Sequence, residues 1–240
     1  MTDDAPTTRR PGGPIFIRPY HIIWVLDCTS SLARSRRLET LNCYIRESLP
    51  VFTEYAAENP NVNVLMSAVT YGTGARWHLE PTEVINLSWP DVFDCGGASD
   101  AGDAFQLVEC RLRRWYWGLA NPEGWSAYGG NIPPLVIWAA GSRPSGHWKD
   151  ALDNLLSLSR RTRTSRAAIF LAEEAPYHAL EEFIGTPELR PLLADDPQKL
   201  LYYLWKGVGE VVRSKAPREE ATLVNIPPFP ASAESSDDVW

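Results

Sequence analysis

The sequence has no long apolar run and few cysteines. No window of its 240 residues approaches the ~18 uninterrupted apolar residues of a membrane-spanning helix, so no membrane association is expected. The first 14 residues lack the apolar core of a signal peptide. The cysteines form no C-x-x-C pair and have no metal-ligand spacing; they are Cys28, Cys43, Cys95 and Cys110. These absences predict a cytoplasmic protein whose thiols are reduced.

Basic residues are also in short supply. The chain carries 23 Lys and Arg against 30 Asp and Glu, a net charge of −7. Because nucleic-acid phosphates require Lys and Arg contacts, this balance argues against a general nucleic-acid binder. Residues 216–240 hold five acids and one base, and so account for −4 of the total. The body of the chain is nearly balanced and indicates no particular charged partner.

What the sequence does contain is enough apolar material for one core. Hydrophobic residues make up 44% of the chain and charged residues 22%, close to a globular average. Residues 1–14 and 216–240 are rich in Pro, Ser, Thr and charge, and are predicted to be disordered tails. No repeat or linker divides residues 15–215, which we expect to form a single domain.

Within that domain, strand-like and helix-like patterns alternate. Short apolar runs predict strands at 21–27, 62–72, 75–80, 133–141, 166–172 and 189–194. Apolar spacing and capping signals predict helices that begin at 38, 99, 148, 177 and 196. The apolar face of the first covers 38–52, Pro50 kinks it or opens a further turn, and Asn59-Pro60 closes the segment; the others cover 99–119, 148–158, 177–184 and 196–213. This alternation is typical of an α/β fold with a doubly wound, mostly parallel sheet and one antiparallel edge hairpin. Its ligand site should lie at the carboxyl ends of the strands.

Oxygen-bearing side chains follow the first predicted strand. Asp27, Thr29 and Ser31 form a D-x-T-x-S pattern on the loop that enters a helix. A carboxylate and two hydroxyls suit a hard cation such as Mg²⁺, although the same residues could simply cap the helix. A second loop, CGGASDAGDAF at 95–105, opens another helix and presents Ser99 nearby in the predicted sheet.

Together these segments resemble the von Willebrand factor type A (VWA) family, in particular its bacterial stand-alone branch associated with tellurite resistance. The resemblance covers residues 18–214, and its marks are the D-x-T-x-S strand end, the VTYGTGARW hairpin, the GGASDAGDAF loop, the strand LVIWAAG and the closing LEEFIGTPELRPLLADDPQKLLYYLWKGV. It implies a metal-ion-dependent adhesion site. Asp27, Thr29 and Ser31 match the first loop of that site, and Ser99 matches its second-loop threonine.

The third loop departs from the family pattern. Where the family has Asp followed by Gly, this chain has Ala140 and Gly141, so one carboxylate near the metal is missing. A lost negative charge weakens cation binding, and we expect a degenerate site that holds Mg²⁺ weakly or not at all. Asp100 or Asp103 could supply the charge, but acids at a helix start usually just complement the helix dipole. We also expect Asp27, Ser99 and Ala140 to meet in one crevice.

Two further clusters have alternative explanations. Five aromatic residues around a Gly- and Pro-rich loop either cover the end of the sheet or form a contact patch for a protein partner. They are Trp115, Tyr116, Trp117, Trp125 and Tyr128, and all but Tyr116 are the candidate contacts. Four arginines within seven residues predict either a solvated helix end or an anion contact; they are Arg160, Arg161, Arg163 and Arg166.

The resemblance implies a non-enzymatic protein-interaction module of a bacterial cytoplasmic regulatory, stress-response or defence system, with a Ser/Thr kinase or a PP2C-type phosphatase as a partner. The alternative is an enzyme. The strand into Asp27-x-Thr29 is also similar to haloacid-dehalogenase-type phosphatases, which would use Asp27 as a Mg²⁺-assisted nucleophile. Lys149 and the pair Asp195 and Asp196 would have to complete that site. The chain lacks the P-loop, dinucleotide-binding and G-x-S-x-G motifs, and we expect no catalysis.

Overall fold

A computed structural model describes residues 17–97, 99–117, 132–171, 175–187 and 189–193, with residues 115–117 described by their backbone alone. In these ranges one six-stranded sheet has the order β3-β2-β1-β4-β5-β6. Only β2 and β3 pair antiparallel, and every other neighbouring pair of this sheet is parallel. The strands are β1 (Arg18–Asp27), β2 (Val62–Gly72), β3 (Gly74–Glu83), β4 (Leu135–Ala140), β5 (Ser165–Phe170) and β6 (Leu192–Leu193). The predicted α/β fold with one antiparallel edge hairpin is confirmed.

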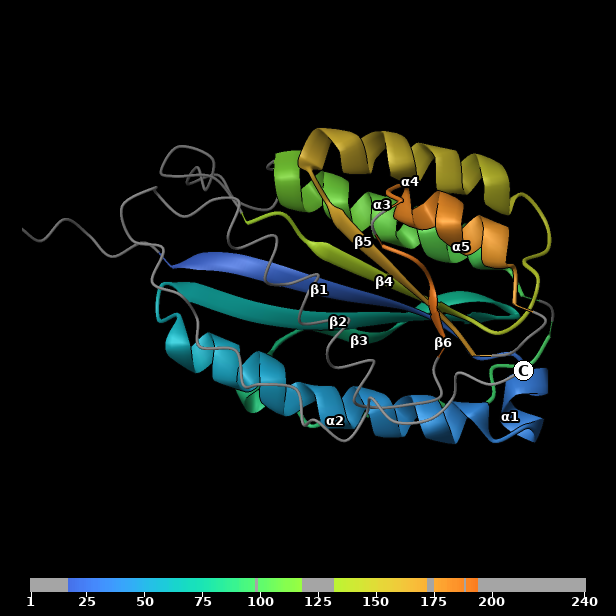
Figure 1. Cartoon of the computed structure of the whole chain (residues 1–240), viewed down its shortest axis with the longest axis horizontal. Helices are drawn as coiled ribbons and strands as arrows, with labels where there is room; N and C mark the ends of the chain where they lie inside the picture. The colour runs from blue at the N-terminus through green and yellow to red at the C-terminus, as the bar shows by residue number, and fades with distance from the viewer. Residues whose placement is uncertain (1–16, 98, 118–131, 172–174, 188, 194–240) are drawn as a thin grey trace, which may run out of the picture.

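Helices cover both faces of the sheet (Figure 1). One face carries α1 (Ser30–Arg34) and α2 (Arg37–Glu58), and the other carries α3 (Ala101–Trp117), α4 (Trp148–Thr162) and α5 (Tyr177–Ile184). The short 3-10 helix η1 (Val84–Asn86) follows β3. No helix in the described ranges is long and apolar enough to cross a membrane. A parallel sheet covered on both faces explains why β1 and β4 read as continuous apolar runs.

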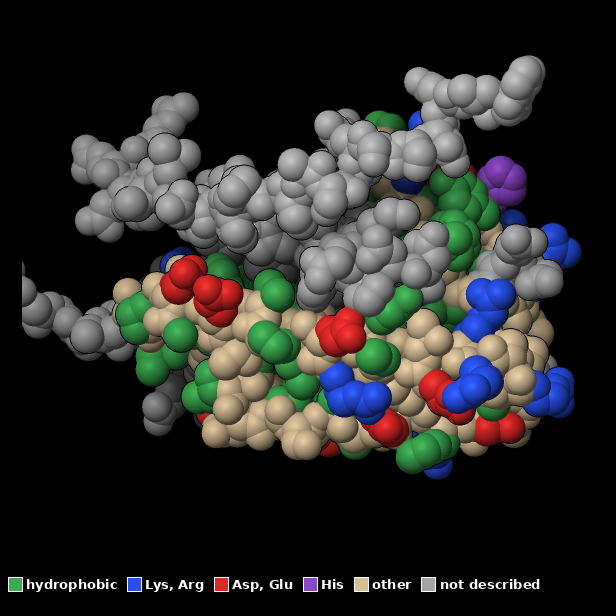
Figure 2. Space-filling view, turned by 60° about the horizontal axis from the view of Figure 1, so that its bottom comes forward, with side chains coloured by type: hydrophobic (Ala, Val, Ile, Leu, Met, Phe, Trp, Pro, Cys, Tyr) green, Lys and Arg blue, Asp and Glu red, His purple; other side chains and the backbone are tan. Residues whose placement is uncertain are grey.

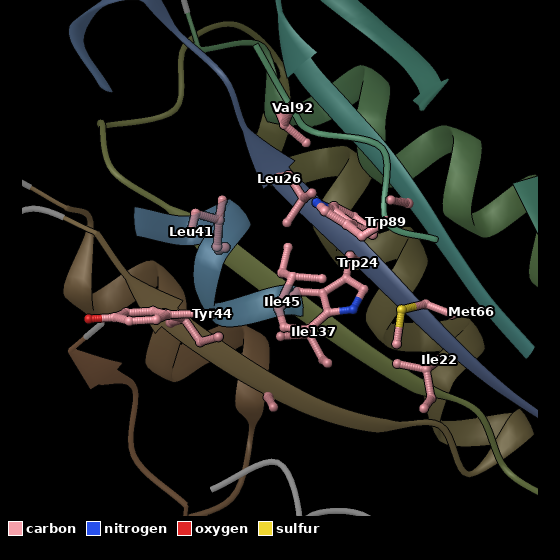
Figure 3. Close-up of a cluster of buried hydrophobic side chains, with 14 of the residues drawn as sticks. Ile22, Trp24, Leu26, Leu41, Tyr44, Ile45, Met66, Trp89, Val92 and Ile137 are labelled. Carbon is pink, nitrogen blue, oxygen red and sulfur yellow. The ribbon is translucent and has the colours of Figure 1, made fainter. Parts of the chain in front are cut away.

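Successive residues of β1 pack into two separate cores. Ile22, Trp24 and Leu26 point towards α2, where they meet Leu41 and Ile45 (Figure 3). Ile23 and Val25 point to the opposite face and join the core beneath α3, α4 and α5. The side-chain alternation of a strand therefore fixes both helical layers to one central element. Asp27 is the last residue of this buried strand, so its position is set by both cores.

Helix α2 continues through Pro50 to Glu58 and so ends where Asn59-Pro60 predicts, while the strand at the other end of the chain differs from its expected bounds. Pro50 lacks the N–H that would bond the Arg46 carbonyl, but both residues are exposed, so water can satisfy that carbonyl. The strand predicted at 189–194 is reduced to β6, and the helix predicted at 196–213 lies outside the described residues.

Candidate functional site

The candidate site lies where the strand order of the sheet reverses. β1 pairs with β2 on one side and with β4 on the other, and all three strands are parallel. The carboxyl ends of β1 and β4 therefore lie at the same edge, and their outgoing loops diverge to opposite faces. This is the position at which doubly wound folds bind ligands. The loop that leads into α3 reaches the same edge, because Cys95 donates its N–H to the Cys28 carbonyl at 2.8 Å.

Protein donors surround the carboxylate of Asp27, which is fully buried. Its Oδ1 accepts a hydrogen bond from the Thr29 N–H at 3.1 Å. Its Oδ2 accepts bonds from the N–H groups of Gly141 and Ser142, each at 3.1 Å, and from the Ser142 hydroxyl at 2.7 Å. Bonds of this kind stabilise an ionised carboxylate. These bonds join the first and third loops directly.

The three predicted hydroxyl ligands differ in their surroundings. The hydroxyls of Thr29 and Ser31 lie 3.1 Å apart and bond each other. The Ser99 hydroxyl is buried and makes no well-formed hydrogen bond with a described residue. It nevertheless lies near the Tyr71 phenol and lowers the pKa of that group. The Ser99 carbonyl accepts a bond from the Ser145 N–H at 2.8 Å, which ties the second loop to the third. Asp27, Ser99 and the segment that follows Ala140 therefore meet at one edge of the sheet.

A buried tyrosine lies beneath these loops. Burial raises the pKa of Tyr71 well above its usual value, and the negative charge of Asp27 raises it further. Interactions with Trp138 and Ser99 act in the opposite direction, and the Trp138 indole N–H donates to the Tyr71 oxygen at 2.8 Å. Tyr71 consequently remains a neutral phenol and supplies no negative charge to a cation.

A disulfide joins the first two loops of the site. Cys28, the second residue of the D-x-T-x-S pattern, is bonded to Cys95, so the prediction of reduced thiols was wrong for this pair. Cys43 and Cys110 remain thiols. The spacing of 67 residues hid the pair from a motif search. The expected approach of the two loops was the signal that could have revealed it, since each loop carries one cysteine.

The loop that precedes Ser99 is held in place at several points. Asn42 of α2 donates to the Val92 carbonyl at 2.8 Å and accepts from the Val92 N–H at 2.8 Å. Asp94 accepts bonds from the Gly96 N–H and the Ser30 hydroxyl, which hold the pKa of its carboxyl below the usual range. Between these anchors Phe93 is 75% exposed. Sequence reasoning did not single out Phe93, because nothing local distinguishes an exposed aromatic residue from a buried one.

The residues at this edge fit a divalent cation poorly. Ala140 is fully buried and offers no oxygen, and both oxygens of Asp27 already accept protein hydrogen bonds. In the described ranges no cluster of His, Cys, Asp or Glu could hold a metal ion. Of the proposed substitutes, Asp103 lies 3.8 Å from His147, and the Oδ1 of Asp100 is buried near Gly146. The features that favour a ligand here are the buried Ser99 hydroxyl and this Asp100 oxygen, neither of which makes a well-formed hydrogen bond with a described residue.

The other predicted residues are spread over the molecule. Trp115 and Trp117 lie at the end of α3, where the side chains are not described, and Trp125 and Tyr128 lie outside the described residues. Arg166 has a structural contact, because its guanidinium donates to the carbonyls of Phe183 and Ile184 at the end of α5.

Lys149 is the second residue of α4. Asp195 and Asp196, which the phosphatase alternative also requires, lie outside the described residues.

Comparisons with known proteins relate this chain to others through structure. No protein-family model matches the sequence, and no curated protein matches it significantly. Proximal thread matrix protein 1 from the mussel byssus superposes with a TM-score of 0.51 at 14% identity, over 83% of this chain and 46% of its own. A von Willebrand factor type A protein from Catenulispora acidiphila gives 0.52 at 11% identity, over 83% and 43%. Manganese-loaded TRAP protein from Plasmodium vivax gives 0.52 at 13% identity, over 80% and 74%.

These likenesses concern the fold. This chain spans less than half the length of the mussel and Catenulispora proteins. Sequence identity is below 15% in each comparison, so residue roles do not transfer from them. The strand order, the helical layers and the loops that meet at Asp27 agree with this structural match. The chain therefore has a von Willebrand factor type A fold.

Proposed function

We propose that this chain is a non-enzymatic protein-interaction module that binds its partner at the carboxyl edge of the sheet without requiring a metal ion. Proteins with this fold generally serve as interaction or adhesion modules. The proposal that binding needs no metal ion rests on the Asp27 carboxylate, which is buried and accepts hydrogen bonds from four protein donors. Recognition then rests on surface packing around this edge.

An exposed aromatic side chain supports this assignment of the edge. Phe93 is 75% exposed on a loop held by Asn42, by Asp94 and by the disulfide at Cys95. An exposed ring on an anchored loop loses little conformational entropy when a partner covers it. Aromatic residues also contribute disproportionately to binding energy at protein interfaces. Phe93 is therefore the residue that we expect to contribute most to the contact with the partner.

The enzyme alternative conflicts with the geometry of Asp27. A phosphatase nucleophile must present a carboxylate oxygen to the phosphorus atom of the substrate. Asp27 is fully buried, and its Oδ2 accepts three hydrogen bonds while its Oδ1 accepts one. Attack would require breaking bonds that join two loops. The buried, fully hydrogen-bonded Asp27 carboxylate favours the interaction module over catalysis.

The biological setting follows from the sequence resemblance alone. We place the module in a bacterial cytoplasmic regulatory system concerned with stress response or defence, of the kind associated with tellurite resistance. The partner that the resemblance implies is a Ser/Thr kinase or a PP2C-type phosphatase of the same system. The aromatic residues Trp115, Trp117, Trp125 and Tyr128 remain candidates for part of the same contact.

The proposal is tested by capturing partners with the full chain and comparing two exposed apolar residues. Phe93→Ala should remove capture of the specific partner. Ile85→Ala should leave it intact, because Ile85 is 61% exposed in η1, which follows the end of β3 at the opposite edge. Capture should also persist in a chelator. A partner that EDTA releases, or that both variants retain, would contradict the proposal.

A further inference from the structure

A second concave site lies beside Asp27 at the same edge of the sheet. A cavity of about 450 Å³ lies between the start of α4, with the loop that leads into it, and the start of α5. Its lining includes Arg143, Pro144, Trp148, Lys149, Tyr177 and His178. Arg143 directly follows Ser142, which donates to Asp27. The cavity therefore adjoins the surface to which the partner is assigned.

Cations outnumber carboxylates among the described residues that line the cavity. Arg143 and Lys149 are both exposed, and neither forms an ion pair with a described residue. Among the described lining residues, Glu182 alone carries a negative charge. Figure 2 shows Lys and Arg side chains interspersed with Asp and Glu side chains towards one end of the molecule.

Flat apolar walls lie next to these cations. Trp148 is partly buried against the core, with the Lys149 ammonium 5.8 Å from its ring centre. The Tyr177 ring packs edge-on against Phe170, with the ring centres 5.7 Å apart. Pro144 is buried and closes one side. The rings of Trp148 and Tyr177 thus lie next to two exposed cations. This combination suits a ligand that has an apolar group and a negative charge close to each other.

We propose that this cavity binds an acidic peptide segment of the partner. The carboxylates pair with Arg143 and Lys149, and an apolar or aromatic side chain of the segment lies against Trp148 and Tyr177. This inference rests on the proposed function and names the chemistry of its partner. The volume lies within the roughly 300–1,000 Å³ of typical ligand pockets. The exposed, unpaired cations favour a carboxylate-bearing occupant through charge complementarity.

The test measures binding of a defined probe to the full chain. The probe is a fluorescein-labelled pentapeptide with four glutamates around one tryptophan, followed by fluorescence anisotropy. Arg143→Ala combined with Lys149→Ala should weaken binding about tenfold, since both charge-assisted contacts are lost. The matched control, Arg160→Ala with Arg161→Ala, removes two cations at the far end of α4 and should change affinity less than twofold. The glutamine version of the peptide should not bind.

Three results would overturn the inference. The control pair could weaken binding as much as the cavity pair, or the cavity pair could have no effect. Inorganic phosphate could displace the peptide at equal concentration, which would show a site for small anions instead. Partner capture separates this inference from the proposed function. A partner lost with Phe93→Ala but retained by the Arg143 and Lys149 variant supports the module and contradicts the cavity assignment.

Discussion

The Ser142 hydroxyl donates a 2.7 Å hydrogen bond to Asp27 Oδ2 across 115 residues of sequence. With the Ser142 and Gly141 N–H groups, it gives this oxygen three donors from the loop after β4. The same loop has Ala140 where the resembling family has an acid. A carboxylate at Ala140 would add negative charge beside Asp27 and would need a cation to offset it. The loop observed here supplies donors instead.

Removing that hydroxyl should destabilise the fold. Ser142→Ala leaves a fully buried carboxylate with one donor fewer, and we expect a loss of about 1–3 kcal/mol in the free energy of unfolding. Ser157→Ala, at an exposed position of α4, is the matched control and should change stability by less than about 0.5 kcal/mol. Denaturant unfolding monitored by circular dichroism measures both. Equal stability of the two variants would show that the Ser142 bond is not a significant restraint.

The disulfide should contribute strongly to stability. In the chain-entropy model, the Cys28–Cys95 link closes a loop of 67 residues and stabilises the fold by about 4 kcal/mol. Cys28→Ser combined with Cys95→Ser should lower the melting temperature, and dithiothreitol should lower that of the natural chain. Cys43→Ser with Cys110→Ser should leave sensitivity to the reductant unchanged. A reductant-insensitive melting temperature in the natural chain would contradict the disulfide.

A buried histidine predicts a loss of stability in acid. Burial, with a smaller effect from the Arg111 charge, lowers the pKa of His21 to about 3 from the usual 6.5. Arg111 is paired with Glu80 and stacked on Trp77, and His21 bonds the Ser67 hydroxyl at 2.8 Å. The unfolded chain therefore binds the proton first. The free energy of unfolding therefore keeps its full value above pH 6.5. It falls as the pH drops towards 3, by up to about 1.4 kcal/mol per pH unit.

Substitution isolates the contribution of His21. His21→Gln should flatten the pH dependence of the free energy of unfolding between pH 6.5 and 4.5. His178→Gln is the control, because the His178 side chain is fully exposed and its loss should leave the slope unchanged. Urea titrations at several pH values measure the slope. A natural chain that is equally stable at pH 4.5 and 6.5 would show that His21 is not neutral and buried in the folded state.

The sequence was most informative where structure depends on local pattern. The apolar run before Asp27 and the helical spacing around Leu41 predicted β1 and α2, because burial of a periodic face largely determines such elements. Asn59-Pro60 predicted the end of α2, and Pro50 is tolerated inside the helix because its missing hydrogen bond falls on the exposed side.

The site itself was only partly predictable. Asp27 and Ser99 could be placed at one edge from the family pattern. The bond from Ser142 and the pairing of Cys28 with Cys95 depend on how separate loops meet in space. The exposure of Phe93 likewise follows from anchors on α2 that lie 50 residues away in sequence, such as the bond between Asn42 and Val92. Contacts of this kind leave no periodic signal in the sequence.

The central claim is that protein donors, and not a metal ion, satisfy Asp27 and hold the three loops together. Calorimetric titration with Mg²⁺ and with Mn²⁺ tests it most directly, on the natural full chain and on the variants Ala140→Asp and Asp27→Ala. Circular dichroism confirms that the Ala140→Asp variant is folded. We predict no saturable binding below the millimolar range for the natural chain, none for Asp27→Ala, and measurable binding once the second carboxylate is present. Micromolar binding by the natural chain that Ala140→Asp does not improve would contradict the account.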